Sequence, residues 1–195
     1  MSDTIQIPMF PLTLLPLPGE LVPLHIFEPR YKQLLEEAES QDLSFGIFFS
    51  HDSNAEKIGS LMKLESVIKR YPGGESDIIV RCVDVFSMEV MSRTFKRKPY
   101  PGGIVRLWQI DISGVPGTQL YESFLEFMNH RKISKHVSTF SVFQIANELN
   151  MDFAERYAFL LAPEETREKF LVNRIRFLIH LLNQELKSKD VFHLN

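Results

Sequence analysis

The chain has 195 residues, of which 44% are hydrophobic and 24% charged, with a formal net charge of −3 and a single cysteine. These values are typical of a folded domain of ordinary size, and they exclude a disordered chain, an intramolecular disulfide framework and a zinc site built from several cysteines. The charge is uneven, since residues 69–110 hold eight basic and four acidic side chains although the whole chain is acidic.

The first extended segment is rich in proline. Residues 5–10 alternate in the manner of a strand, but Pro8 and Pro11 lack the backbone N–H that a central strand donates. The prolines therefore predict either a strand at the edge of a sheet or an irregular extended path.

A short amphipathic helix is predicted to begin after Glu28. Pro29 suits the first turn of a helix, where its missing N–H is not needed. Four apolar residues then recur at helical spacing, namely Tyr31, Leu34, Leu35 and Ala38. The neighbouring acidic residues, Glu36, Glu37 and Glu39, are expected to face water.

Further strands are expected over residues 43–50, 60–71, 77–91 and 104–112. The second and third flank Pro72-Gly73-Gly74 and so predict a hairpin whose loop is longer than the tight two-residue type. Cys82, in an apolar strand, is interpreted as a small core residue. Strands of this number and spacing favour a small barrel or folded sheet over a parallel βαβ fold.

After Gly114 the apolar residues follow helical spacing. Helices are predicted over residues 118–130, 141–149, 152–162 and 163–187, with Asp152 as a helix cap. We therefore expect an α+β chain with a β-rich subdomain of residues 1–114 and a helical subdomain of residues 115–195.

Motifs for catalysis or for cofactor binding are missing from the sequence. It contains no Gly-x4-Gly-Lys-[Ser/Thr] loop, no Gly-x-Ser-x-Gly elbow and no His-Glu-x-x-His. Ser66 and Lys69 have Ser-x-x-Lys spacing, which leaves a small-molecule hydrolase open, but residues three apart in a strand point to opposite faces. The six histidines show no ligand spacing. We predict no catalytic residue, no metal site and no cofactor.

The sequence also lacks signals for a membrane or for export. No run of about 18 or more apolar residues occurs, and the first residues lack the basic region of a secretory signal. Together with the single cysteine, these features predict a cytoplasmic protein that does not enter a membrane.

The segment 93–98 is strongly basic and surrounds one aromatic ring. Proteins that bind single-stranded RNA use cations to contact the phosphates and aromatic rings to stack on the bases. The simpler interpretation is a solvated loop that keeps sheet edges from pairing, and it is preferred because the rest of the chain is acidic. The residues concerned are Arg93, Phe95, Lys96, Arg97 and Lys98.

Three groups of residues near the amino terminus occur in a distinctive order: Ile7-Pro8-Met9-Phe10-Pro11-Leu12, then Pro18-Gly19, then Val22-Pro23-Leu24-His25-Ile26-Phe27-Glu28-Pro29-Arg30-Tyr31. This order resembles the opening of the Lon protease amino-terminal domain, and the resemblance continues at residues 58–61 and 173–178. Residues 81–86 depart from the family pattern, because Cys82 replaces a glycine and Val85 an arginine. No ATPase or peptidase module follows, so the chain is similar to stand-alone Lon substrate-binding-domain proteins.

The resemblance implies a PUA-like β pseudo-barrel followed by a C-terminal α-helical bundle. It also implies a non-enzymatic module that recognises unfolded or tagged polypeptides, in protein quality control or as a proteolysis adaptor, with a protease or chaperone as a further partner. An RNA-binding PUA-like protein that uses residues 93–98 is the alternative. The apolar motif residues Pro23, Leu24, Ile26, Phe27 and Pro29 are expected to form core and turn. The polar ones, His25, Glu28, Arg30 and Tyr31, are the candidates for polypeptide binding.

Overall fold

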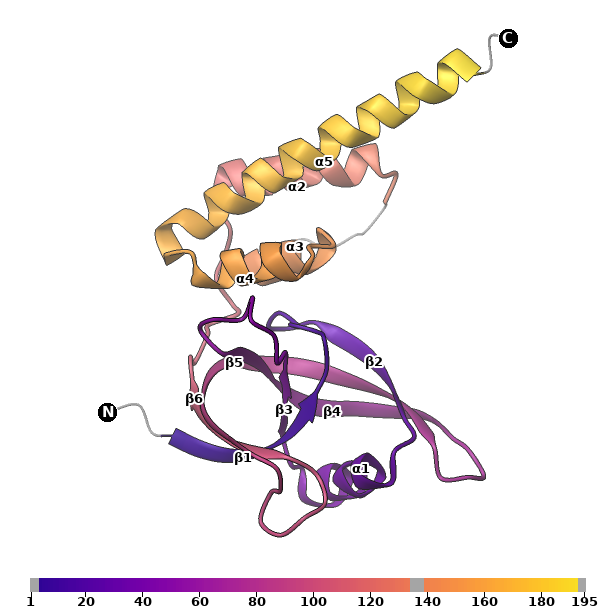
Figure 1. The fold of residues 1–195 in the computed structure, drawn as a ribbon. Helices are drawn as coiled ribbons and strands as arrows, with labels where there is room; N and C mark the ends of the chain where they lie inside the picture. The colour runs from indigo at the N-terminus through magenta and orange to yellow at the C-terminus, as the bar shows by residue number, and fades with distance from the viewer. Residues whose placement is uncertain (1–3, 134–138, 193–195) are drawn as a thin grey trace. The chain divides into compact units, whose positions relative to one another are not determined.

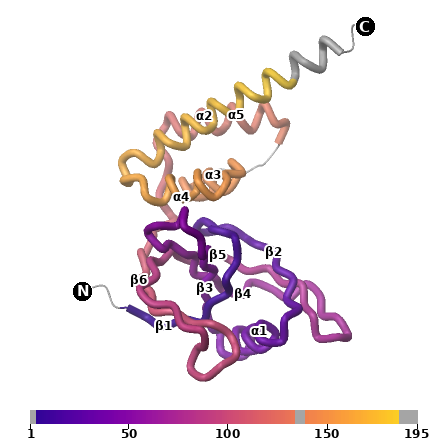
Figure 2. Tube along the Cα trace, viewed as in Figure 1, coloured from indigo at the N-terminus to yellow at the C-terminus, as the bar shows by residue number. Residues whose placement is uncertain are grey.

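The computed structural model describes residues 4–133 and 139–192, with the side chains of the last helix up to Glu185 (Figure 1, Figure 2). The chain divides into two units, a β-rich unit of residues Met1–Ile112 and a helical unit of residues Ser113–Asn195. This division lies two residues from the one predicted between residues 114 and 115.

The β-rich unit contains a six-stranded mixed sheet with the strand order β2-β5-β4-β3-β1-β6. β5 also pairs with β6, which closes β5, β4, β3, β1 and β6 into a barrel, while β2 pairs with the first part of β5 (Figure 1). β1 and β3 are parallel, and the other pairs are antiparallel. The strands are β1 (Thr4–Pro11), β2 (Leu21–Ile26), β3 (Phe45–Phe48), β4 (Ile58–Arg70), β5 (Ser76–Ser92) and β6 (Gly102–Leu107).

β1 lies inside the sheet, so the edge position that its prolines predict is wrong. Residues 4–8 pair with β6, and residues 9–11 pair with β3. The pairing therefore changes from β6 to β3 at Pro8 and Met9, and the N–H of Met9 still donates to the Pro101 carbonyl at 2.8 Å. This switch lets a strand with two missing N–H groups take part in the barrel.

The predicted β4–β5 hairpin is confirmed by its antiparallel register, which runs from Ile58 opposite Ser87 to Arg70 opposite Ser76. Gly74 has a φ of 84°, a conformation that glycine adopts readily. β2 was not predicted, because Pro23 interrupts its apolar pattern. It forms nevertheless, since its whole length pairs with β5.

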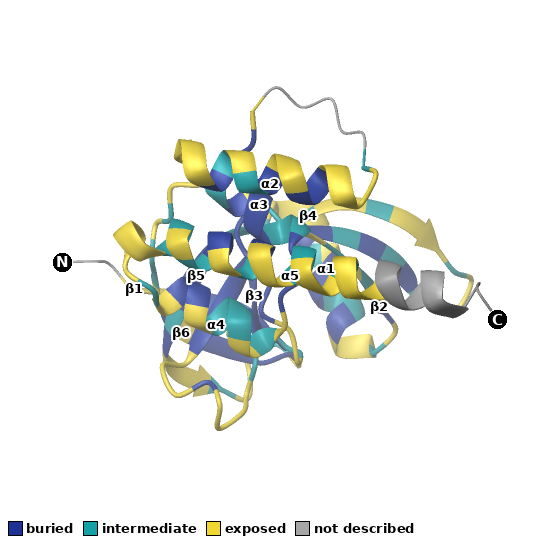
Figure 3. Cartoon of the chain, turned by 90° about the horizontal axis from the view of Figure 1, so that it is seen from above, coloured by how far each residue is buried: buried dark blue, intermediate teal, exposed yellow. Residues whose placement is uncertain are grey.

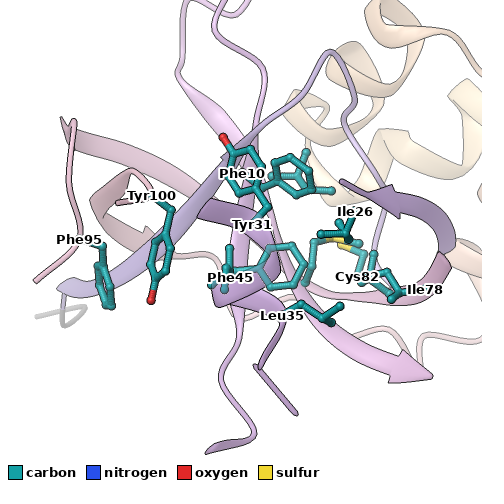
Figure 4. Packing of buried hydrophobic residues seen from close by; sticks show 13 residues of the cluster. Phe10, Ile26, Tyr31, Leu35, Phe45, Ile78, Cys82, Phe95 and Tyr100 are labelled. Carbon is teal, nitrogen blue, oxygen red and sulfur yellow. The ribbon is translucent and has the colours of Figure 1, made fainter. Parts of the chain in front are cut away.

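One hydrophobic core lies between the barrel and α1 (Pro29–Gln41), whose four predicted apolar residues are all buried. Figure 4 shows its aromatic centre, in which the rings of Phe10 and Tyr31 lie 4.1 Å apart. Cys82 belongs to this core and is fully buried, which confirms its interpretation as a core residue. Burial raises the pKa of its thiol.

The helical unit contains the four predicted helices: α2 (Thr118–His130), α3 (Val142–Glu148), α4 (Phe153–Leu161) and α5 (Glu164–Phe192). Ser141 caps α3 and Asp152 caps α4, each with a reciprocal bond to the third helical residue. α2 and α5 pack against each other (Figure 1). The expected α+β class, a β pseudo-barrel followed by helices, is confirmed.

Candidate functional site

A hollow of about 400 Å³ lies beside β2 in the β-rich unit. We call it the β2 hollow. It brings together three of the four predicted polypeptide-binding residues, which are His25, Glu28 and Tyr31, and surrounds them with mainly apolar side chains. The complete lining is Phe10, Leu12, Thr13, Leu14, Pro23, Leu24, His25, Phe27, Glu28 and Tyr31.

Phe27 is the most exposed large apolar side chain of the lining, at 60%. The preceding residue, Ile26, is buried. Successive residues of an extended segment point to opposite sides, so Phe27 points away from the core. Leu14, which also lines the hollow, is 40% exposed. The expectation that Phe27 belongs to the core is therefore wrong. Of the other four residues expected to form core and turn, Ile26 is buried, Leu24 packs half-buried against the core, Pro29 opens α1, and Pro23 is exposed.

Arg30 does not line the hollow but balances the charge of Glu28, the acidic residue of its lining. Its guanidinium donates to the Glu28 carboxylate, with Nε and Nη2 at 2.9 and 2.8 Å from Oε2. The same guanidinium lies 4.6 Å from the centre of the Tyr31 ring. Tyr31 is itself a core residue at 4% exposure, and burial raises its pKa. Tyr31 thus presents a packed ring to the hollow.

The imidazole of His25 is oriented by a hydrogen bond to a residue of the β4–β5 hairpin. Its Nδ1 lies 2.6 Å from Oδ1 of Asp77, whose Oδ2 accepts a hydrogen bond of 2.6 Å from the Tyr71 hydroxyl. The hydrogen bonds from Tyr71 and then His25 lower the pKa of Asp77. The ring of His25 also stacks on Phe27, with 6.0 Å between ring centres. His25 is therefore oriented at the rim of the hollow.

Asp77 and Tyr71 were missed by the sequence analysis. Asp77 stands directly opposite His25 in the pairing of β2 with β5. Since β2 was not predicted, no sequence signal placed these side chains together.

The basic segment 93–98 keeps three exposed cations, Arg93, Lys96 and Arg97. Phe95, however, is only 5% exposed and stacks on Tyr100, with 6.0 Å between ring centres. Phe95 therefore presents no open ring face on which a base could stack. An RNA-binding role for this segment rests on charge alone and stays a prediction.

Lys98, the fourth cation, pairs with Glu37 of α1 at 2.9 Å. Glu37 Oε1 also accepts from Gln33 Nε2, at 3.0 Å, and Oε2 accepts from the Tyr100 hydroxyl, at 2.8 Å. The expectation that Glu37 faces water is therefore wrong. The hydrogen bond from Lys98 lowers the pKa of Glu37, while burial, followed by the bond to Glu37, raises the pKa of Tyr100.

Replacing Glu37 with glutamine is expected to make the free energy of unfolding less dependent on pH in the acidic range. The lowered pKa of folded Glu37 means that its contribution, about 1–2 kcal/mol, is complete above its unfolded pKa and is lost as the pH falls through the folded pKa. Urea unfolding of wild type and Glu37→Gln from pH 3 to 7 should give a difference that shrinks below about pH 4.5. Glu36→Gln, at an exposed position of the same helix, is the control. A constant difference across this range would contradict the prediction.

Other sequence features do not assemble into a site. Ser66 and Lys69 lie on an exposed stretch of β4, where Nζ of Lys69 lies 4.4 Å from the centre of the Tyr71 ring. Within residues 4–133 and 139–192, no three His, Cys, Asp or Glu side chains are grouped so that they could hold a metal ion. None of the described helices has the length and apolar character needed to cross a membrane.

Comparison with known proteins gives a family match over most of the chain. The family model of the ATP-dependent protease La (LON) substrate-binding domain matches residues 6–164. The crystal structure of a Lon N-terminal domain protein from Xanthomonas campestris is similar, with a TM-score of 0.63 and 18% identity over 90% of this chain and 98% of that one. The N-terminal domain of Mycobacterium avium complex Lon protease matches with a TM-score of 0.48 and 15% identity, over 92% and 98% of the two chains. No curated protein matches the sequence.

Proposed function

The chain belongs to the family of ATP-dependent protease La (LON) substrate-binding domains, and on this basis we propose that it is a module that binds unfolded or tagged polypeptide without hydrolysing it. The observation that carries the proposal is an apolar hollow beside an open strand edge. Unfolded chains differ from folded ones in exposing apolar side chains and unpaired backbone groups together. A site that offers both kinds of contact is suited to them.

The β2 hollow supplies the apolar contacts. Its volume of about 400 Å³ lies within the range of ligand pockets and is large enough for a bulky side chain. Phe27 and Leu14 stand partly in water at its rim, so a bound side chain would cover them. Burying one large apolar side chain contributes roughly 1.5–3 kcal/mol, which makes this contact the main source of affinity.

The free edge of β2 supplies backbone groups. Among the described residues, β2 pairs with β5 alone. The N–H of Cys82 donates to the Glu20 carbonyl at 2.9 Å, and in an antiparallel pair the backbone groups of alternate residues point away from the partner strand. Pro23 therefore has its missing N–H on the outer edge of β2. A peptide that pairs with this edge cannot accept a backbone hydrogen bond from that residue. The residues that point their backbone groups outward are Leu21, Pro23 and His25.

Replacing Phe27 with aspartate is expected to weaken binding at least tenfold, since it removes an apolar contact worth about 1.4 kcal/mol or more and adds a charge beside Glu28. Fluorescence anisotropy with a labelled, reduced and carboxymethylated model protein measures the affinity. Ile68→Asp is the matched control, because Ile68 is 64% exposed on β4 and does not line the hollow.

Two outcomes would contradict the proposal. Equal affinity of wild type and Phe27→Asp would remove the β2 hollow from the binding site. Cleavage of the model protein by the purified wild-type chain would show that the module is an enzyme.

We further propose a cytoplasmic role in protein quality control, either alone or as an adaptor that presents polypeptide to a protease or chaperone. The family membership supports the binding step that such a role requires. The same model protein provides the test, because an adaptor should accelerate its degradation by a purified ATP-dependent protease, and an unchanged rate would count against this role.

A further inference from the structure

The helical unit has an apolar face that the described helices leave uncovered. On α4, Ala154, Ala158 and Leu161 are exposed at the spacing i, i+4 and i+7, so they form one stripe. On α5, Phe177 and Leu181 are exposed at i and i+4. We call these five residues the α4–α5 face. Figure 3 marks the many exposed positions along α5, which is not enclosed by its neighbours.

A hollow of about 470 Å³ opens on this face between α4 and α5. Ala154 and Ala158 line it from α4, while Phe170 and Phe177 line it from α5. Small residues four apart on a helix leave room for the close approach of another helix, whereas Phe177 is a large side chain that stays 50% exposed at the same hollow. The face therefore holds both a recess and a large side chain that fits such a recess.

One ion pair joins the two helices at the hollow. Glu155 of α4 and Arg174 of α5 form an ion pair at 2.5 Å, and the Arg174 guanidinium lies 5.6 Å from the Phe177 ring centre. Asn173 also lines the hollow, and Nε of Arg174 is a buried donor to which the described residues supply no acceptor, while the other lining residues are apolar. A partner therefore needs mainly apolar side chains here, and the charge of Arg174 is already balanced by that of Glu155.

We propose that the α4–α5 face is the contact surface between two copies of this chain, related by a two-fold axis. A two-fold contact requires that one patch contain both complementary shapes, because the same residues meet from both sides. The recess at Ala154 and Ala158 and the exposed Phe177 meet this requirement. Each Phe177 would enter the recess of the other copy, and Leu161 and Leu181 would extend the contact.

An unfolded polypeptide fits this face less well than a helix does. Helical backbone groups are bonded within the helix, so an extended chain gains no backbone hydrogen bonds here, in contrast to the edge of β2. A helix packs by side chains alone, and α5 of a second copy carries large apolar residues at the required spacing.

The exposed apolar area of the α4–α5 face is close to the smallest that specific dimers use. Leu161, Phe177 and Leu181 are 45%, 50% and 42% exposed. At about 200 Å² for each whole side chain they offer roughly 270 Å² of apolar surface per copy, to which the alanines add. Small specific interfaces bury about 600 Å² per partner, a little over half of it apolar. The face therefore comes close to this lower limit, and a dissociation constant in the micromolar range is expected.

Sedimentation equilibrium of the full chain from about 1 to 100 μM tests the proposal. Wild type should pass from monomer to dimer, and Phe177→Glu should raise the dissociation constant at least tenfold. Leu125→Glu, a matched change at a position of α2 that is 41% exposed, should leave it unchanged. A monomer throughout the range, or equal effects of the two variants, would overturn the proposal.

A cysteine variant provides a second test that does not depend on weakening the contact. Asn173 is exposed and lines the hollow, so the proposed dimer brings the two copies of this residue together, and Asn173→Cys should form a disulfide-linked dimer under mild oxidation. Cys82 is fully buried and does not compete. Phe177→Glu added to this variant should abolish the cross-link. A cross-link that survives it would overturn the proposed geometry.

Discussion

Replacing Phe86 with alanine is expected to lower the free energy of unfolding by about 3–5 kcal/mol. Phe86 is fully buried on β5, and the barrel strands approach its ring so closely that they leave no room for side chains at Gly46 and Gly59. A Cβ built on Gly59 would lie 2.3 Å from a ring atom of Phe86 and 2.8 Å from the carbonyl oxygen of Ile47. Strand backbone at these two glycines therefore lies against the ring, and it cannot move in to fill the cavity that alanine would leave.

Urea unfolding of wild type and Phe86→Ala measures this loss. Phe27→Ala is the matched control, because it removes the same side chain at a position that is 60% exposed, and a loss below about 1 kcal/mol is expected there. If the two variants lose similar amounts, the ring of Phe86 does not support the barrel in the way described.

Replacing Asp84 with alanine is expected to cost about 2–4 kcal/mol, the largest effect we expect from a polar residue. Asp84 is 8% exposed, and its carboxylate accepts three backbone hydrogen bonds. Oδ1 accepts from the N–H groups of Val85 and Ile110, at 2.8 and 3.1 Å, and Oδ2 accepts from that of Gln109, at 3.0 Å. Gln109 has a φ of 55°, a backbone conformation that residues other than glycine rarely adopt. The hydrogen bond from its N–H to the Asp84 carboxylate helps to hold that conformation.

Asp84→Asn should lose an intermediate amount, because its amide keeps one acceptor oxygen and turns the other position into a donor. Glu89→Ala is the control on the same strand, since its exposed ion pair with Arg106 should contribute no more than about 1 kcal/mol. Thermal and urea unfolding both measure the differences. A loss for Asp84→Ala no larger than that for Glu89→Ala would contradict the role assigned to this carboxylate.

The candidate site was partly predictable because most of its residues are close in the sequence. His25, Glu28 and Tyr31 lie between the end of β2 and the first turn of α1, so any structure of that segment keeps them near one another. The partners that hold the site were not predictable. Asp77 is 52 residues from His25 in the chain, and only the pairing of β2 with β5 brings the two together.

Burial was predicted well where apolar periodicity was strong and poorly where residues were judged one at a time. The apolar stripe of α1 is buried as expected. Phe27, Phe95 and Glu37 each differ from expectation, since Phe27 is exposed, Phe95 is buried and Glu37 is hydrogen-bonded to Tyr100 and Lys98. Each outcome depends on which distant segment lies beside the residue, and composition does not contain that information.

The sequence by itself determined the local structure: the four helices of the second unit, the cap at Asp152, the β4–β5 hairpin and the motif that marks the family. These features depend on residues a few positions apart, whose spacing and hydrogen bonds can be inferred directly from the chain. Only the tertiary structure decided that β6 closes the barrel on β5, that β2 adds an open edge, and that a hollow forms beside it. Periodicity shows that a face must be covered, but the segment that covers it is selected by packing between residues far apart in the chain.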